Sequence, residues 1–129
     1  MPRSLLPVIY IALLFYSSQS TAATASHFLK SCKLALQGMS SPESVMDPKD
    51  SLNSGYCLGV VKGVKDSASI WGWKGSSSTS VCIPEEGVST EKVIKLTIAF
   101  IEENKETLRS TEDTTVTTLA LHRSFPCAQ

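Results

Sequence analysis

Apolar residues in the middle of the chain recur at a helical spacing. They stand four residues apart, at Leu52, Tyr56, Val60, Val64 and Ala68. This spacing gathers side chains on one face of a helix, so it predicts a buried helix over residues 53–71, capped by Asp50 or Ser51. A strand is the alternative, because residues 56–61 are rich in β-forming types. The glycines at every fourth position and the charged segment that follows favour the helix.

The same segment carries a second stripe, which consists of Gly55, Gly59 and Gly63. A glycine inside a helix costs roughly 1 kcal/mol relative to alanine. A helix with three of them indicates a close approach, at which a Cβ would be in the way. We therefore predict that these glycines are helix-packing residues, where the backbone of this helix lies close against another helix.

Three more helices are predicted around this central one. The first covers residues 26–37, with Ser26 as its N-cap and Cys32 on its apolar face. The next follows Ser89 and runs to about residue 104, and the last runs from Ser110 to about residue 125. The segment 39–49 contains two prolines and no periodicity, so it is expected to be a loop. The pattern predicts an all-α fold, a small disulfide-stabilised bundle of about four to five helices.

The first 25 residues have the pattern of a secretory signal peptide. Arg3 precedes the apolar run 5–16, and small residues follow up to Ala25. The run of about 12 residues is shorter than the 20 or so that span a bilayer. We expect residues 1–25 to be the signal peptide and 26–129 a single exported domain, with cleavage after Ala23 as the second choice. An uncleaved N-terminal anchor is the alternative, and no other segment has the pattern of a membrane span.

The charge of the exported part is close to neutral. The whole chain has 12 basic and 12 acidic residues, and removal of Arg3 leaves 11 against 12, a net charge of −1. This balance gives no electrostatic reason to bind nucleic acid, or a membrane after signal cleavage. A partner is therefore expected to be recognised by shape and local chemistry.

All four cysteines lie in the exported part, which indicates two disulfides. The favoured pairing is Cys32–Cys57 and Cys82–Cys127, because antiparallel neighbouring helices bring the first two together, and the other two pairings stay open. The spacings match no zinc motif, so we expect neither a metal nor a cofactor.

Catalytic chemistry is not indicated by the sequence. A nucleophilic site would need a serine or cysteine beside a histidine base, and the chain has only His27 and His122. Neither histidine lies in a nucleophile motif, and the three glycines miss the spacing of a phosphate-binding loop. We therefore expect that the protein is not an enzyme.

One loop combines large aromatic residues with small flexible ones. Residues 72–81 are rich in glycine and serine, and both tryptophans of the chain lie at or in this loop. One interpretation is that the rings fold back over the core. The other is that the loop presents a partner-binding surface, because exposed loop aromatics often anchor interfaces. Its predicted contact residues are Trp71, Trp73, Lys74 and Ser77.

Several short motifs, in this order, resemble the Tai/Rap family of immunity proteins. They are Gly55-Tyr56-Cys57-x-Gly59, Asp66, Cys82-Ile83-Pro84, Gly87-Val88-Ser89 and Ser124-Phe125-Pro126-Cys127. The resemblance runs from about Phe28 to Cys127. It implies a helical, periplasmic and usually dimeric protein that binds a peptidoglycan amidase effector of a type VI secretion system and blocks its active-site cleft.

A second hypothesis is a periplasmic acid or stress chaperone, because such chaperones are also small, helical and disulfide-bonded. A chaperone should expose apolar surface on acidification, whereas an inhibitor should stay folded and bind one enzyme tightly. Two disulfides favour a rigid, preorganised surface and hence the inhibitor.

Overall fold

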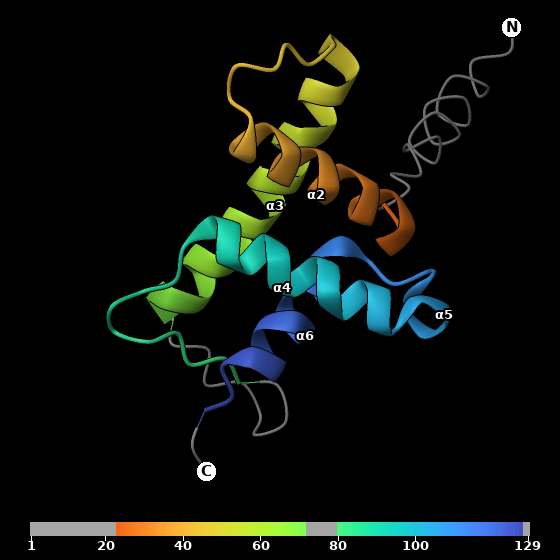
Figure 1. Cartoon of the computed structure of the whole chain (residues 1–129). Helices are drawn as coiled ribbons and strands as arrows, with labels where there is room; N and C mark the ends of the chain where they lie inside the picture. The colour runs from red at the N-terminus through yellow and green to blue at the C-terminus, as the bar shows by residue number, and fades with distance from the viewer. Residues whose placement is uncertain (1–22, 72–79, 128–129) are drawn as a thin grey trace, which may run out of the picture.

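The computed structural model describes residues 23–71 and 80–127, which contain five helices and no strand (Figure 1). The helices are α2 (Ala25–Ser40), α3 (Pro48–Trp71), α4 (Thr90–Glu103), α5 (Lys105–Leu108) and α6 (Asp113–Ser124). Helices α2 and α3 form an antiparallel hairpin, and α4 packs against α2, α3 and α6. The predicted all-α, disulfide-stabilised bundle is confirmed.

The central helix begins earlier than the sequence pattern indicated. Asp47, and not Asp50 or Ser51, caps α3, because its Oδ1 accepts hydrogen bonds from the backbone N–H groups of Lys49 at 2.8 Å and Asp50 at 3.0 Å. Pro48 occupies the first helical position, where its missing N–H costs nothing. In α4, by contrast, Ser89 is the N-cap that was predicted, and its hydroxyl accepts a bond from the Lys92 N–H at 3.2 Å.

The core is formed where four of the helices meet. Its largest fully buried side chains on α2 and α4 are Phe28, Ile94 and Ile101. Helix α6 adds Val116 and Leu121, together with Thr117. The Thr117 hydroxyl donates to the Asp113 carbonyl at 2.9 Å, so this polar group is buried without losing a partner.

The core-facing side of α3 is wider than the predicted apolar stripe. The fully buried α3 residues are Cys57, Val61 and Ala68. Of the predicted stripe only Ala68 is buried to this extent, and Leu52 is 75% exposed. Tyr56, Val60 and Val64 are partly buried and pack against the core. The predicted stripe is therefore confirmed as core-facing except at Leu52, and its most deeply buried neighbours are Cys57 and Val61.

Two disulfides cross-link the fold. The bridges join Cys32 on α2 to Cys57 on α3, and Cys82 to Cys127, as the sequence analysis favoured. Both sulfur-bearing residues of the first bridge are fully buried, so it belongs to the core. The second bridge ties the segment before α4 to the end of the described chain.

A polar contact between helices supplements these bridges. The Tyr56 hydroxyl on α3 donates to Oδ2 of Asp113, which lies at the start of α6 and is 8% exposed. Oδ1 of Asp113 also accepts from the backbone N–H of Thr114 at 2.6 Å. Both oxygens of this buried carboxylate therefore have donors, which fixes the first turn of α6 against α3.

Removing the core disulfide should lower the stability strongly. The Cys32–Cys57 bridge has a sequence separation of 25 residues, and closing a loop of that size contributes about 3–4 kcal/mol in the chain-entropy model. The double variant Cys32→Ala/Cys57→Ala is expected to lose about that much unfolding free energy in urea titrations. The variant Cys82→Ala/Cys127→Ala serves as comparison for the exposed bridge. An unfolding free energy equal to that of the parent protein would contradict the expectation.

Candidate partner-binding surface

The histidines and cysteines of the described ranges have structural roles. All four cysteines are oxidised. The Nδ1 atom of His122 lies 2.9 Å from the Ser80 carbonyl oxygen. A carbonyl oxygen only accepts, so Nδ1 carries the proton and donates it. Nowhere in residues 23–71 and 80–127 do three or more His, Cys, Asp or Glu side chains gather in a way that could hold a metal ion.

The segment that follows the glycine- and serine-rich loop is firmly attached to α6. Val81 is fully buried and forms an isolated antiparallel bridge with Pro126. The Cys82 N–H donates to the Phe125 carbonyl at 2.9 Å, and the disulfide to Cys127 adds a covalent tie. Residues 80–82 are thereby held by a buried side chain, backbone bonds and a cross-link.

The partner-binding residues predicted from the sequence fall at the edge of the described structure or beyond it. Trp71 is the last residue of α3, and its side chain is outside the described part. Trp73, Lys74 and Ser77 belong to residues 72–79, which are also outside it. Their role therefore stays a prediction.

The glycines of α3 do not pack against another helix of this chain. A Cβ built on Gly55, Gly59 or Gly63 meets none of the other described segments within 4 Å. The prediction of close helix packing at these three positions was therefore wrong within one chain. The physical reason is the orientation of α3, which turns Cys57 and Val61 towards the core and leaves the glycines on the open side. Gly38, which the pattern did not single out, has the close contact, with the Met46 sulfur 3.2 Å from a Cβ built there.

On its open side α3 forms an apolar groove with α6. The groove has a volume of about 630 Å³. Helix α3 contributes Gly59, Val60, Gly63, Val64, Ser67 and Ala68, and α6 contributes Thr114, Thr115, Thr118 and Leu119. The walls are mostly apolar or small, and the absence of side chains on Gly59 and Gly63 deepens the hollow. This arrangement suits an apolar surface or a helix of another protein.

A charged pair stands on the same helix as the groove. Lys62 donates to Asp66 one turn further along α3, and this hydrogen bond is the largest cause that lowers the pKa of Asp66. Both side chains are largely exposed, so the pair contributes little to stability. Lys65 lies 3.4 Å from the other carboxylate oxygen of Asp66, so two lysines share this one acidic side chain.

The sequence analysis did not find the α6 wall of the groove. The run Thr114, Thr115, Thr117 and Thr118 was read only as a weak helix former. In the structure Thr117 is fully buried, whereas Thr114 and Thr115 are exposed and Thr118 is partly exposed. The available signal in the sequence was the position of these threonines around the helix. Thr117 follows Val116 on the face that enters the core, whereas Thr114 and Thr115 lie on the outer face.

These features define a class of protein: a small, disulfide-bonded helical protein with an open apolar groove between two of its described helices. No helix in the described ranges is long and apolar enough to cross a membrane.

The chain belongs to the Rap1a immunity protein family. The family model for Rap1a immunity proteins matches residues 24–127, which includes every described helix. The resemblance to the Tai/Rap family is thereby confirmed, and membership makes this chain an immunity protein against a secreted effector. Comparison with curated proteins and with solved structures gives no match.

Proposed function

We propose that this protein binds and inhibits a peptidoglycan amidase effector of a type VI secretion system in the periplasm. The family match over residues 24–127 carries the proposal, since immunity proteins act by binding a cognate effector. The two disulfides support an oxidising compartment such as the periplasm. The amidase as target rests on the sequence motifs that resemble the Tai/Rap family.

The inhibitory contact is assigned to the loop between α3 and residue 80. Its predicted contact residues are Trp71, Trp73, Lys74 and Ser77. The attachment of Val81 and Cys82 to the end of α6 supports this assignment, because it fixes the point at which the loop returns to the body. Fixing the ends of a binding loop lowers the entropy that it loses on binding.

Trp73→Ala should weaken binding of the amidase without changing the fold. Truncation of a central interface tryptophan commonly costs about 2 kcal/mol or more, which is roughly a 30-fold loss of affinity. Titration calorimetry against a purified peptidoglycan amidase effector that the unchanged protein binds measures that loss, and thermal unfolding of the same variant tests the fold.

A control for this variant is Phe125→Ala, because Phe125 is partly buried against the core and its truncation should lower the melting temperature. If Trp73→Ala behaves like this control, the ring covers the core and the loop assignment is wrong. If the unchanged protein binds no amidase, the chaperone hypothesis gains instead.

The structure favours a mature chain that begins at Thr24. The Thr24 carbonyl accepts the Phe28 N–H at 2.9 Å, and Thr24 forms an isolated bridge with Glu112. Ala25 is buried, and its N–H donates to the Thr111 carbonyl at 3.1 Å. Cleavage after Ala25 would remove all of these contacts, whereas cleavage after Ala23 keeps them.

Intact-mass spectrometry of the periplasmic protein is therefore expected to give the mass of residues 24–129. The mass of a chain that starts at Ser26 would contradict this expectation and would indicate cleavage after Ala25. Retention of the full chain in the membrane fraction would instead support the uncleaved anchor.

We also propose that two copies associate through the groove between α3 and α6, as the resemblance to usually dimeric proteins implies. Three glycines on the open side of one helix lower its helix propensity, and nothing in the described part of the chain uses the space that they leave. A second copy that lies against Gly59 and Gly63 gives these glycines a role, since a missing Cβ lets two backbones approach closely.

Gly59→Leu should separate the two copies without unfolding either one. The leucine side chain enters the groove, where it excludes the second copy, and its higher helix propensity supports the isolated chain. Light scattering is expected to give twice the chain mass for the unchanged protein and the single chain mass for the variant. Gly55→Leu is the matched control, since Gly55 is exposed but does not line the groove. The mass of a single chain for the unchanged protein would contradict the dimer. The mass of two chains for Gly59→Leu would contradict the groove as the dimer interface.

A further inference from the structure

The end of the α2–α3 hairpin projects from the body of the molecule. From residue 36 to residue 56 no side chain is fully buried, although Ala35 and Cys57 on either side of this stretch are. Figure 1 shows this end of the hairpin, which includes the connection between α2 and α3, standing away from α4, α5 and α6. We call residues 37–55 the hairpin arm, because Leu36 and Tyr56 at its two ends still pack against the core. The Cys32–Cys57 disulfide lies at its base.

The hairpin arm carries every large apolar side chain that the described residues expose. These are Met39, which is 43% exposed, Val45, which is 99% exposed, and Leu52, which is 75% exposed. Single exposed apolar residues are ordinary on protein surfaces. Here all three lie within fourteen consecutive residues, and no other large apolar side chain in the described ranges is exposed. Such clustering of exposed apolar residues is typical of an interaction surface.

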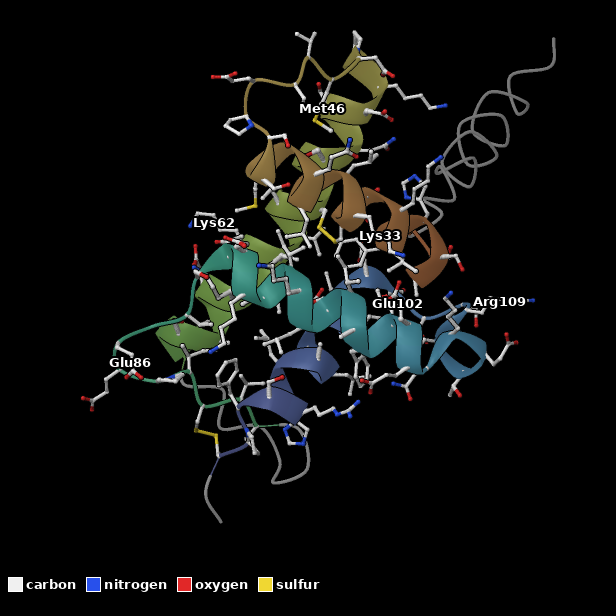
Figure 2. The ribbon with its side chains drawn as sticks, in the orientation of Figure 1. Lys33, Met46, Lys62, Glu86, Glu102 and Arg109 are labelled. Carbon is white, nitrogen blue, oxygen red and sulfur yellow. A yellow bond between two sulfur atoms is a disulfide. The ribbon has the colours of Figure 1, made fainter. Side chains whose placement is uncertain are left out.

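The arm is held in one conformation by local contacts. Asp47 caps α3 through the two backbone bonds described above. At the other side of the turn the Ser44 hydroxyl and N–H both donate to the Ser41 carbonyl, at 2.7 and 3.0 Å. Met46, labelled in Figure 2, packs its sulfur over Gly38. Because the turn is already ordered, docking of this surface loses little conformational entropy.

The arm also has a charge that the whole chain lacks. It contains Glu43, Asp47 and Asp50 against the single Lys49, a net charge of −2, whereas the whole chain is neutral. None of the ion pairs formed by the described residues involves these four side chains. The exposed apolar side chains are thus set among carboxylates that lack a basic partner in the described structure.

We propose that the hairpin arm is a second docking element for the effector and inserts its apolar side chains into a hollow edged by lysine or arginine. This inference rests on the proposed function. The charge selects the partner: a second arm or an anionic lipid surface would meet the carboxylates with the same sign, whereas a basic edge attracts them. The turn of the arm precedes α3, whereas Trp71, the first predicted loop contact, ends it, and the 24 residues of α3 span about 36 Å.

The test is the affinity of two arm variants for a purified peptidoglycan amidase effector of a type VI secretion system. Val45→Ser/Leu52→Ser removes exposed apolar contacts and should weaken binding about tenfold or more, mainly through faster dissociation. Glu43→Lys should slow association severalfold at low salt and reduce its salt dependence. Thermal unfolding of both variants is expected to match the unchanged protein, because these three side chains are exposed.

A matched control separates a local effect from a change in total charge. Glu106→Lys makes the same change on α5, where Glu106 is exposed, outside the hairpin arm. It should leave both rates close to those of the unchanged protein. Equal slowing by Glu106→Lys and Glu43→Lys would overturn the arm as the site of attraction.

The remaining outcomes distinguish the arm from the proposed function. If the unchanged protein binds the amidase and the double variant binds equally well, the arm proposal is wrong and the proposed function stands. If the unchanged protein does not bind the amidase at all, the proposed function fails, and with it the assignment of the arm to that partner. Binding of the unchanged protein to phosphatidylglycerol vesicles that is lost in Val45→Ser/Leu52→Ser would assign the arm to lipid and overturn the proposal.

Discussion

The covalent bond between Cys32 and Cys57 holds α2 against α3 at the level where the core ends. On one side of it, Phe28, Val61 and Ala68 are buried against α4 and α6. On the other side, Ala35 is the last buried residue of α2, and from residue 36 to residue 56 the two helices and their connection have no fully buried residue. A projecting hairpin without a core of its own would fray readily, because most helical stability comes from tertiary packing. The disulfide stabilises the projecting hairpin of this chain, because the two helices cannot separate at their last packed turn.

Much of the fold is predictable because its determinants are local. The helix pattern, the Ser89 cap and the facing cysteines all act within one or two elements. The orientation of α3 is not local. Apolar residues lie on two neighbouring stripes of α3, and the stripe with Cys57 and Val61 is the more deeply buried. Cys57 forms the disulfide with Cys32 on α2. A small rotation of α3 about its axis decides where Gly59 lies. The sequence placed Gly59 against another helix, whereas in the structure it lines the groove.

The candidate surfaces were less predictable than the fold. The aromatic loop was found because Trp71 and Trp73 stand out in composition, but its contacts lie beyond the described residues. The groove depends on α3 and α6 meeting at residues far apart in sequence, such as Val60 and Leu119, which no single segment reveals. In the hairpin arm, the segment 39–49 with Val45 was predicted to be a plain loop, and Leu52 was assigned to the buried stripe of the central helix. Both side chains become informative only through their exposure.

The order of the bridges along the chain has a consequence for biogenesis. The first disulfide joins the first two cysteines and the second joins the last two, so the two covalent loops do not overlap. A chain that enters an oxidising compartment N-terminus first exposes Cys32 and Cys57 before Cys82 and Cys127. Oxidation in order of arrival then yields the native pairs directly, and no thiol–disulfide exchange is needed to correct them. The native connectivity is therefore the one that oxidation in order of arrival produces.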